Sequence, residues 1–410
     1  MFDHFIEPPL LISLILDIGN YMVFFILFYI ARQAKIINSN LFALAGLMLL
    51  TPFFGNGFLF SWTQLPDQSK YLKMAQEIRS NFPYIANAEF CNGSILHVGA
   101  PGEDCSEVGF FSRQQKVRFS SLLFSFSPLI SLESFKSIGF LNRALFIFTL
   151  LFFIKKKYLP LYVKLFFIFS PSAIMYSSVS LRDNLILLSL IWALYFFLKR
   201  SYIFLIITCI ILYIIKLQNL LILLTLFYLI MTFEDSKYKM MQTLSKLSML
   251  SVIPFFYFYG KRVLEFINGY RFGFFSEENG VYVSMTGKSE FEPLIFSYAT
   301  IPYLIERGIF FLTAPVTGLN GPFDIIISFE IFLIYVFLFR GFIKDIKIKS
   351  LKNITLIWMF IFFFVAALHG MILFNDGMVA RYRIVLFLFV MIGYEMHKSI
   401  IMSKHKTIRN

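Results

Sequence analysis

The sequence carries little charge for its length. Charged residues make up 15% of its 410 residues, whereas soluble globular domains have about 25%. Hydrophobic residues make up 58%, which is more than a soluble fold of this size can bury. The apolar runs are continuous and do not alternate with polar residues, which excludes a transmembrane β-barrel. The chain is therefore expected to be an all-α, polytopic integral membrane protein.

Motifs for nucleotide or metal chemistry are also missing. The sequence holds no P-loop, no glycine-rich dinucleotide fingerprint and no zinc-ligand spacing. It has no internal repeat and no low-complexity tract, and we expect no cleavable signal peptide. We therefore expect no cofactor and no metal ligand set, and leave a divalent-ion requirement open. The net charge of +13 does not indicate a nucleic-acid partner, because much of the Lys and Arg lies in short loops beside apolar runs.

Cysteine is scarce, with three residues in the chain. Cys209 lies inside an apolar run and is expected to be inert. Cys91 and Cys105 share one hydrophilic loop. They could form a disulfide if that loop faces an oxidising compartment, and they could equally be free thiols.

The sequence is rich in long apolar runs. Against the ~20 residues that a membrane helix needs, they predict about 11 spans, roughly 10–13. A further stretch, Ser120–Leu132, is too short to span and is expected to be re-entrant or interfacial. The whole chain, 1–410, is predicted to form one transmembrane domain with two large outer loops, 63–119 and 260–321. The runs are Leu10–Ala31, Leu41–Trp62, Ser137–Ile154, Leu161–Ser177, Asn184–Leu198, Tyr202–Ile215, Leu220–Phe233, Leu247–Tyr259, Phe323–Phe342, Ile354–Phe374 and Ile384–Ile401.

Basic residues in the short loops set the predicted orientation. They collect in alternate loops, as at Lys155–Lys157, at Lys199 and Arg200, and between Arg340 and Lys352. Cytoplasmic loops carry an excess of Lys and Arg, so these loops are expected in the cytoplasm. The N-terminus then lies outside and the C-terminus inside, and the opposite face collects the long loops.

An adjacent Arg182 and Asp183 lie between two apolar runs on that outer face. Charges placed between membrane segments are costly and mostly functional. The alternative is a plain surface turn in which Asp183 caps the next helix. Because other unusual charges fall on the same face, we favour an anion site in which Arg182 binds the anion and Asp183 supports it.

In the first large loop, residues 66–78 are expected to form a helix with Asp67 as its N-cap. Such a helix would lie along the membrane surface. Asp67 is either only a cap or a carboxylate at the mouth of a membrane cavity, where it could take a proton from a sugar hydroxyl. Four residues give the helix an apolar stripe at helical spacing: Tyr71, Leu72, Ala75 and Ile78.

Near the C-terminus, Arg381, Tyr382 and Arg383 follow Asp376 at the outer end of the last run. Positive residues are disfavoured in short outer connections. Two arginines there are expected to bind an anion, because the planar guanidinium suits phosphate. Snorkelling to the membrane interface is the alternative.

Three segments resemble known membrane enzymes. Asp67…Tyr71-Leu72…Ala75 looks like the outer-loop acidic motif of GT-C membrane glycosyltransferases, although here it follows the second apolar run, and in those enzymes usually the first. Pro171-Ser172…Ser177-Ser178…Leu181-Arg182-Asp183 and Ala380-Arg381-Tyr382-Arg383 are similar to segments of the bacterial repeat-unit polymerases for O-antigen and capsule.

The resemblance implies a glycosyltransferase of polysaccharide biosynthesis at the outer face of the bacterial inner membrane. Its donor would be a polyprenyl-diphosphate-linked glycan, and its acceptor a lipid-linked or growing polysaccharide. A chain-length regulator is a candidate partner beside the lipid bilayer. The site would consist of Asp67 as catalytic carboxylate, Arg182, Arg381 and Arg383 as diphosphate ligands, and Asp183, Tyr71, Asp376 and Tyr382 as supporting residues.

Two other functions stay open. A flippase or transporter of lipid-linked oligosaccharide would carry charge along its spans and some repeat symmetry. Charge inside the apolar runs is sparse here, with Asp17, Arg143, Lys164 and Glu330 the clearest cases, which favours the enzyme. A structural subunit that organises other membrane enzymes would not require outward arginines.

Overall fold

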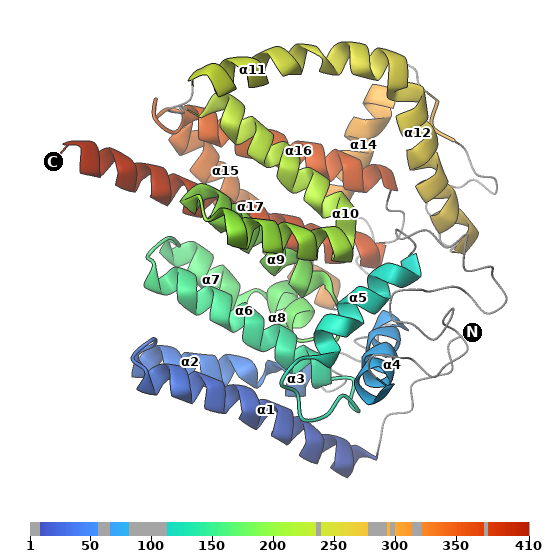
Figure 1. Cartoon of the computed structure of the whole chain (residues 1–410), viewed down its shortest axis with the longest axis vertical. Helices are drawn as coiled ribbons and strands as arrows, with labels where there is room; N and C mark the ends of the chain where they lie inside the picture. Colours follow the sequence, from blue (N-terminus) through green and yellow to red (C-terminus); the bar gives the residue numbers. More distant parts are fainter. Residues whose placement is uncertain are drawn as a thin grey trace. The chain divides into compact units, whose positions relative to one another are not determined.

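The computed structural model describes residues 9–55, 66–81, 113–234, 239–277, 293–295, 300–313, 322–372 and 376–409. These residues form α-helices and no strand (Figure 1). Six of the helices are long and apolar enough to cross a membrane. The chain is therefore an all-α polytopic membrane protein, as its composition predicts, while the number of about 11 spans stays a prediction.

The chain divides into two compact units. Unit 1 comprises Met1–Ala193 and Tyr202–Leu220, and unit 2 comprises Leu194–Ser201 and Leu221–Asn410. Each unit has its own core of buried apolar side chains.

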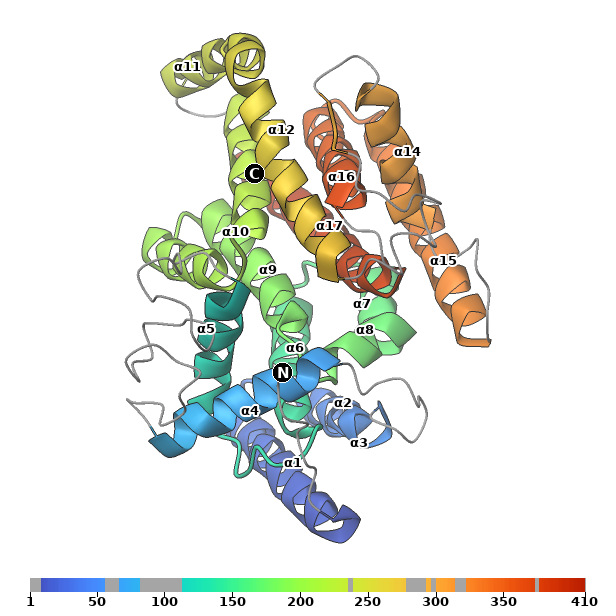
Figure 2. The same ribbon diagram turned by 90° about the vertical axis from the view of Figure 1, so that its right-hand side faces the viewer.

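Unit 1 is built around α6. Of the membrane-spanning part of α6, 78% is buried, against 22% for α1, so α1 turns most of its surface away from the protein. Figures 1 and 2 show α4 and α5 at one end of α1 and α6. In chain order the helices are α1 (Leu10–Gln33), α2 (Ser39–Leu49), α3 (Thr51–Gly55), α4 (Pro66–Asn81), α5 (Arg113–Ser125), α6 (Ser137–Lys155), α7 (Leu161–Phe169), α8 (Pro171–Ser177), most of α9 (Asp183–Lys199) and the first part of α10 (Tyr202–Phe233).

The run Leu161–Ser177, expected as one span, is instead the two short helices α7 and α8. Ser170 between them has an extended backbone with ψ 118°, because the residue before a proline avoids the helical region. Pro171 starts α8, and Ser170 caps it by accepting a hydrogen bond from the Ala173 N–H at 3.0 Å. The nine residues of α7 cover about 13 Å, less than half of the bilayer core.

The runs Tyr202–Ile215 and Leu220–Phe233 are joined into one helical stretch, α10, with a break inside it. The break is the single residue Lys216, whose φ of −161° and ψ of 90° are extended. The two predicted runs leave four residues between them, Lys216–Asn219. The interruption is therefore confirmed, and it is shorter than expected.

The stripe of α4 faces protein rather than the membrane surface. Tyr71 is buried, and its ring lies 6.2 Å from that of Phe124 on α5. Leu72, Ala75 and Ile78 are fully buried as well. The helix begins at Pro66, one residue before the expected cap, because proline favours the first helical position. The side chain of Asp67 and the pair Cys91 and Cys105 lie outside the described residues.

Unit 2 holds the remaining helices, and Figure 2 shows α14, α15 and α16 side by side. α14 crosses α16 at backbone distance, because a Cβ on Gly370 would overlap the Arg307 carbonyl. Part of the expected loop 260–321 is helical, since α12 continues into it and α14 lies within it. Besides the second part of α10, the helices are α11 (Lys239–Leu250), α12 (Val252–Glu277), α14 (Thr300–Thr313), α15 (Pro322–Asp345), α16 (Lys352–Ile372) and α17 (Asp376–Arg409).

Candidate functional site

Two segments of unit 1 leave the helical conformation between helices of the bundle. We name them loop 126–136, between α5 and α6, and loop 178–182, between α8 and α9. The Ser180 hydroxyl donates to the Phe135 carbonyl at 2.5 Å and joins the two loops. Non-helical backbone at membrane depth occurs only where protein buries it or where it lines a cavity. This junction is therefore the candidate site in unit 1.

Loop 126–136 is held by two polar side chains of α1. The Asn20 carbonyl oxygen accepts from the N–H groups of Ile130 at 2.9 Å and Ser131 at 3.2 Å, and its amide donates to the Ser131 carbonyl at 3.0 Å. Asp17 accepts from the Ser134 hydroxyl at 2.7 Å. The i, i+3 spacing puts Asp17 and Asn20 on one face of α1. The sequence shows both residues inside an apolar run, and the structure shows that they bind loop 126–136.

Loop 178–182 is held by α6. The Asn142 amide donates to the carbonyls of Val179 at 2.8 Å and Leu181 at 2.7 Å. A Cβ on Gly139 would overlap the Ser178 carbonyl, so glycine is required for this approach. The irregular backbone of loop 178–182 thus has donors supplied by a neighbouring helix, which its own helices cannot provide.

Arg143 has a structural task beside this loop. In a continuous helix the Met48 carbonyl would accept from residue 52, but residue 52 is proline and has no N–H. The Arg143 Nε–H donates to this carbonyl at 3.0 Å, as does the Thr51 hydroxyl at 2.9 Å, and the Arg143 Nη1–H donates to the Ser177 hydroxyl at 2.7 Å. Arg143 of α6 therefore stabilises the end of α2.

The predicted residues Arg182 and Asp183 lie where loop 178–182 enters α9. α9 begins at Asp183, which is 1% exposed and lies in the first turn, where the helix dipole favours negative charge. Arg182 is partly exposed. The Arg182 carbonyl accepts the first helical hydrogen bond, from the Ile186 N–H at 3.1 Å, so Arg182 takes the cap position and Asp183 is the first helical residue instead of the expected cap.

α4 contacts both loops. The Gln68 side-chain oxygen accepts from the Ser180 N–H at 3.2 Å, and the Gln76 amide donates to the Leu132 carbonyl at 3.0 Å. Gln68 directly follows Asp67, so the first turn of α4 adjoins loop 178–182. The fold thereby brings the segments of Asp67 and Arg182, which are more than a hundred residues apart in the sequence, to the same place in unit 1.

The far end of α4 is fixed by Arg79. Its guanidinium donates to the carbonyls of Ser125, Ser127 and Leu129 at 2.9–3.1 Å, where α5 runs into loop 126–136. Burial lowers the pKa of Arg79 from its ordinary value of 12.5, and the side chain stays a cation at neutral pH.

The two predicted arginines of unit 2 lie inside α17, which begins at Asp376 instead of near Ile384. At about 100° per residue they point some 200° apart around the helix. Arg383 is 2% exposed and donates to the carbonyls of Phe311 at 3.3 Å and Leu312 at 3.5 Å, at the end of α14. Arg381 is partly exposed, with its guanidinium 5.9 Å from the ring of Tyr382. Diphosphate binding by this pair stays a prediction, and the side chain of Asp376 lies outside the described residues.

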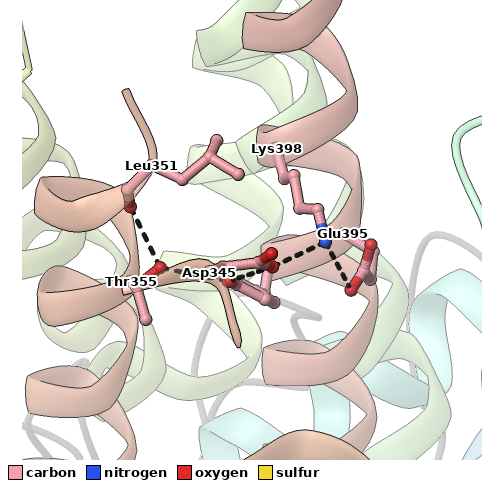
Figure 3. Close-up of polar contacts among 6 residues, drawn as sticks. Asp345, Leu351, Thr355, Glu395 and Lys398 are labelled. Atoms are coloured by element: carbon pink, nitrogen blue, oxygen red, sulfur yellow. Dashed lines mark hydrogen bonds and ion pairs between the residues drawn. The ribbon is translucent and has the colours of Figure 1, made fainter. Parts of the chain in front are cut away.

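A polar cluster in unit 2 was not expected from the sequence (Figure 3). One oxygen of the buried Asp345 carboxylate accepts from the Tyr394 hydroxyl at 2.7 Å and from the Lys398 ammonium at 2.6 Å. Lys398 also lies 3.6 Å from Glu395, and Thr355 lies 3.1 Å from the Tyr394 oxygen. The cluster joins the ends of α15 and α16 to α17. The polar residues of α17 interrupt its apolar pattern and could have been noticed in the sequence. The sequence does not show which residues they contact.

His397 has one defined tautomer beside that cluster. The Trp358 indole N–H, which can only donate, lies 3.3 Å from Nδ1 of His397, so Nδ1 accepts. The proton is then on Nε2, which donates to Glu234 at 3.1 Å. Among the described residues, no group of three or more His, Cys, Asp or Glu is arranged to hold a metal ion.

The candidate site is therefore the junction of loops 126–136 and 178–182 in unit 1, with Arg182 and Asp183 at its edge and the first turn of α4 against it. Comparisons with protein-family models, with curated proteins and with solved structures found no match to this chain.

Proposed function

We propose that the chain is a membrane glycosyltransferase that polymerises a polysaccharide such as O-antigen or capsule. It would transfer a glycan from a polyprenyl-diphosphate-linked donor to a lipid-linked or growing acceptor at the outer face of the bacterial inner membrane. In this proposal Arg182 binds the diphosphate, Asp183 supports it, and Asp67 is the general base. The proposal rests on unit 1.

The observation that carries the proposal is the hydrogen bond from the Ser180 N–H to Gln68. The sequence suggests a carboxylate at Asp67 and a phosphate-binding group at Arg182 for separate reasons. A transferase needs both groups at one place, because the base acts on the acceptor while the cation acts on the leaving group. The contact between the two segments supports that pairing.

The chemistry asked of these residues is limited. The acceptor hydroxyl would attack the anomeric carbon of the donor sugar while the bond from that carbon to the diphosphate oxygen breaks. The diphosphate leaves with the electron pair, and the guanidinium of Arg182 stabilises its growing negative charge. The hydroxyl proton passes to Asp67. The polyprenyl chain stays in the bilayer throughout.

Deletion of the gene, followed by sizing of the lipid-linked glycans, tests the proposal. Loss of the polymerase should leave single repeat units at the outer face and no long chains. Single units trapped on the cytoplasmic face would show a flippase, and an unchanged length distribution would exclude both functions.

A further inference from the structure

Lys136 is a cation at the junction of the two loops. Nothing in the sequence singles out this residue. It is the last residue before α6, and its ammonium lies 3.9 Å from the carboxylate of Asp17. Its side chain is 16% exposed, whereas that of Asp17 is 0% exposed. Among the described residues this ion pair is the only polar interaction of the ammonium. At 3.9 Å it is too long for a hydrogen bond, so the three N–H donors of Lys136 are available.

The backbone of Lys136 is fixed in place. Its N–H donates to the Ser134 hydroxyl oxygen at 3.0 Å, and the Ser134 hydroxyl donates to the buried Asp17 at 2.7 Å. Phe135, the residue before Lys136, accepts the hydrogen bond from Ser180, two residues before Arg182. The fold therefore holds two partly exposed cations, Lys136 and Arg182, on segments that are bonded to each other.

Lys136 differs from three buried or half-buried arginines of the described helices. Arg79, Arg143 and Arg383 donate hydrogen bonds from their guanidinium groups to backbone carbonyls. These bonds offset the cost of removing the charge from water, so no ligand is needed to explain these residues. Lys136 points at no carbonyl, and the carboxylate near it is closer to the protein interior than the ammonium is. A cation with unused donors that reaches the surface fits an anion with several oxygens, such as phosphate.

We propose that Lys136 is a second cationic ligand of the site, and that it binds a phosphate-type anion together with Arg182. The proposal rests on the proposed function only in naming the diphosphate of a lipid-linked donor as that anion. Asp17 is a positioning residue, because it holds Ser134 and the ammonium of Lys136. The competing explanation is that Lys136 only neutralises the buried charge of Asp17.

Titration of the purified protein in detergent with inorganic pyrophosphate tests the anion site directly. Calorimetry should show binding to the wild type, and binding about 10- to 100-fold weaker to Lys136→Gln and to Arg182→Gln. The matched control is Lys155→Gln at the other end of α6, whose ammonium donates to the Ile36 carbonyl at 3.0 Å. It should bind pyrophosphate as the wild type does. Equal affinities of Lys136→Gln and wild type would overturn the inference, as would a wild type that binds no pyrophosphate.

Asp17→Asn separates the two explanations. The amide oxygen can still accept from Ser134, but the negative charge beside Lys136 is gone, so pyrophosphate should bind several-fold more tightly. If Lys136 only neutralised Asp17, the double variant Asp17→Asn, Lys136→Gln would bind pyrophosphate as Asp17→Asn alone does. Binding that stays weak in the double variant supports the anion site.

Glycan extension separates this inference from the proposed function. Pyrophosphate binding that depends on Lys136, in a protein that extends no glycan, would support the anion site and refute the transferase. Normal extension and normal pyrophosphate affinity in Lys136→Gln would support the transferase and refute the role of Lys136.

Discussion

Four buried or half-buried arginines of the described helices donate to backbone carbonyls near the ends of helices. An unpaired carbonyl inside a membrane protein costs several kcal/mol, because no water is present to replace the lost hydrogen bond. For Met48 and Phe311 the residue four positions later is a proline, Pro52 or Pro315, so the usual helical N–H donor is missing. At Met48 the Thr51 hydroxyl donates beside Arg143, at 2.9 Å. The arginines that supply donors are Arg79, Arg143, Arg307 and Arg383.

This arrangement gives Arg383 and Arg381 different expected roles. Arg383→Gln should lower the free energy of unfolding by about 1–3 kcal/mol, because it leaves the Phe311 carbonyl without its donor. Arg381→Gln, two residues earlier and partly exposed, should leave stability unchanged and is the matched control. Thermal unfolding of the two purified variants in detergent measures the difference. Wild-type stability of Arg383→Gln with loss of glycan extension would instead make Arg383 a ligand.

The carboxylate of Asp67 is tested by the isosteric change to asparagine. Asp67→Asn keeps the size and a hydrogen-bonding oxygen in the first turn of α4, so normal amounts of protein should reach the membrane. It removes the base, and glycan extension should fall about 100- to 10,000-fold. Glu77→Gln, later in the same helix, should extend glycans normally. Normal extension in Asp67→Asn would remove Asp67 from the mechanism.

At the scale of elements, hydropathy located the long regular helices well. The run Leu10–Ala31 became α1, and Ser137–Ile154 became α6, each within two residues of its ends. Hydropathy did not locate the breaks, because an apolar residue scores alike in a helix and in an extended segment. The prolines at 52 and 171 carry that information, since they remove a donor and restrict the residue before them.

The candidate site could be predicted only in part for the same reason. Arg182 and Asp183 stand out in the sequence because charge is rare there. Lys136 does not, because a lysine before an apolar run is ordinary. Its importance comes from Asp17 and Ser180, which are distant in sequence and approach it only through the fold. Hydrogen bonds between side chains and irregular backbone leave no periodic pattern to find.

The approach of α6 to loop 178–182 can be tested at Gly139. In Gly139→Ala the added Cβ would overlap the Ser178 carbonyl, and the loop must move. Stability should fall by about 1–3 kcal/mol, and glycan extension should fall with it. Gly269→Ala in α12 is the control, because its Cβ would meet nothing within 4 Å. It should be as stable as the wild type or slightly more so. Equal behaviour of the two variants would show that loop 178–182 tolerates displacement.

At the scale of the whole molecule, the hydrogen bond between Gln68 and Ser180 constrains the topology. α4 and loop 178–182 must lie on the same side of the membrane, whatever the total number of spans. The positive-inside rule puts both outside, because the flanking basic loops at Lys155–Lys157 and at Lys199 and Arg200 are expected in the cytoplasm. The contact places the two segments together, and the outer side stays a prediction from the basic loops.

Reporter fusions test the predicted side of the membrane. Fusions after Lys157 and after Arg200, which flank the segment from α7 to α9, should report the cytoplasm. A fusion within 86–113, the segment that follows α4, should report the outside. A cytoplasmic signal there, together with cytoplasmic signals at the other two positions, would put α4 and its bonded loop on the inner face. Asp67 and Arg182 would then be separated from a donor presented at the outer face, and the proposed reaction could not occur at this site.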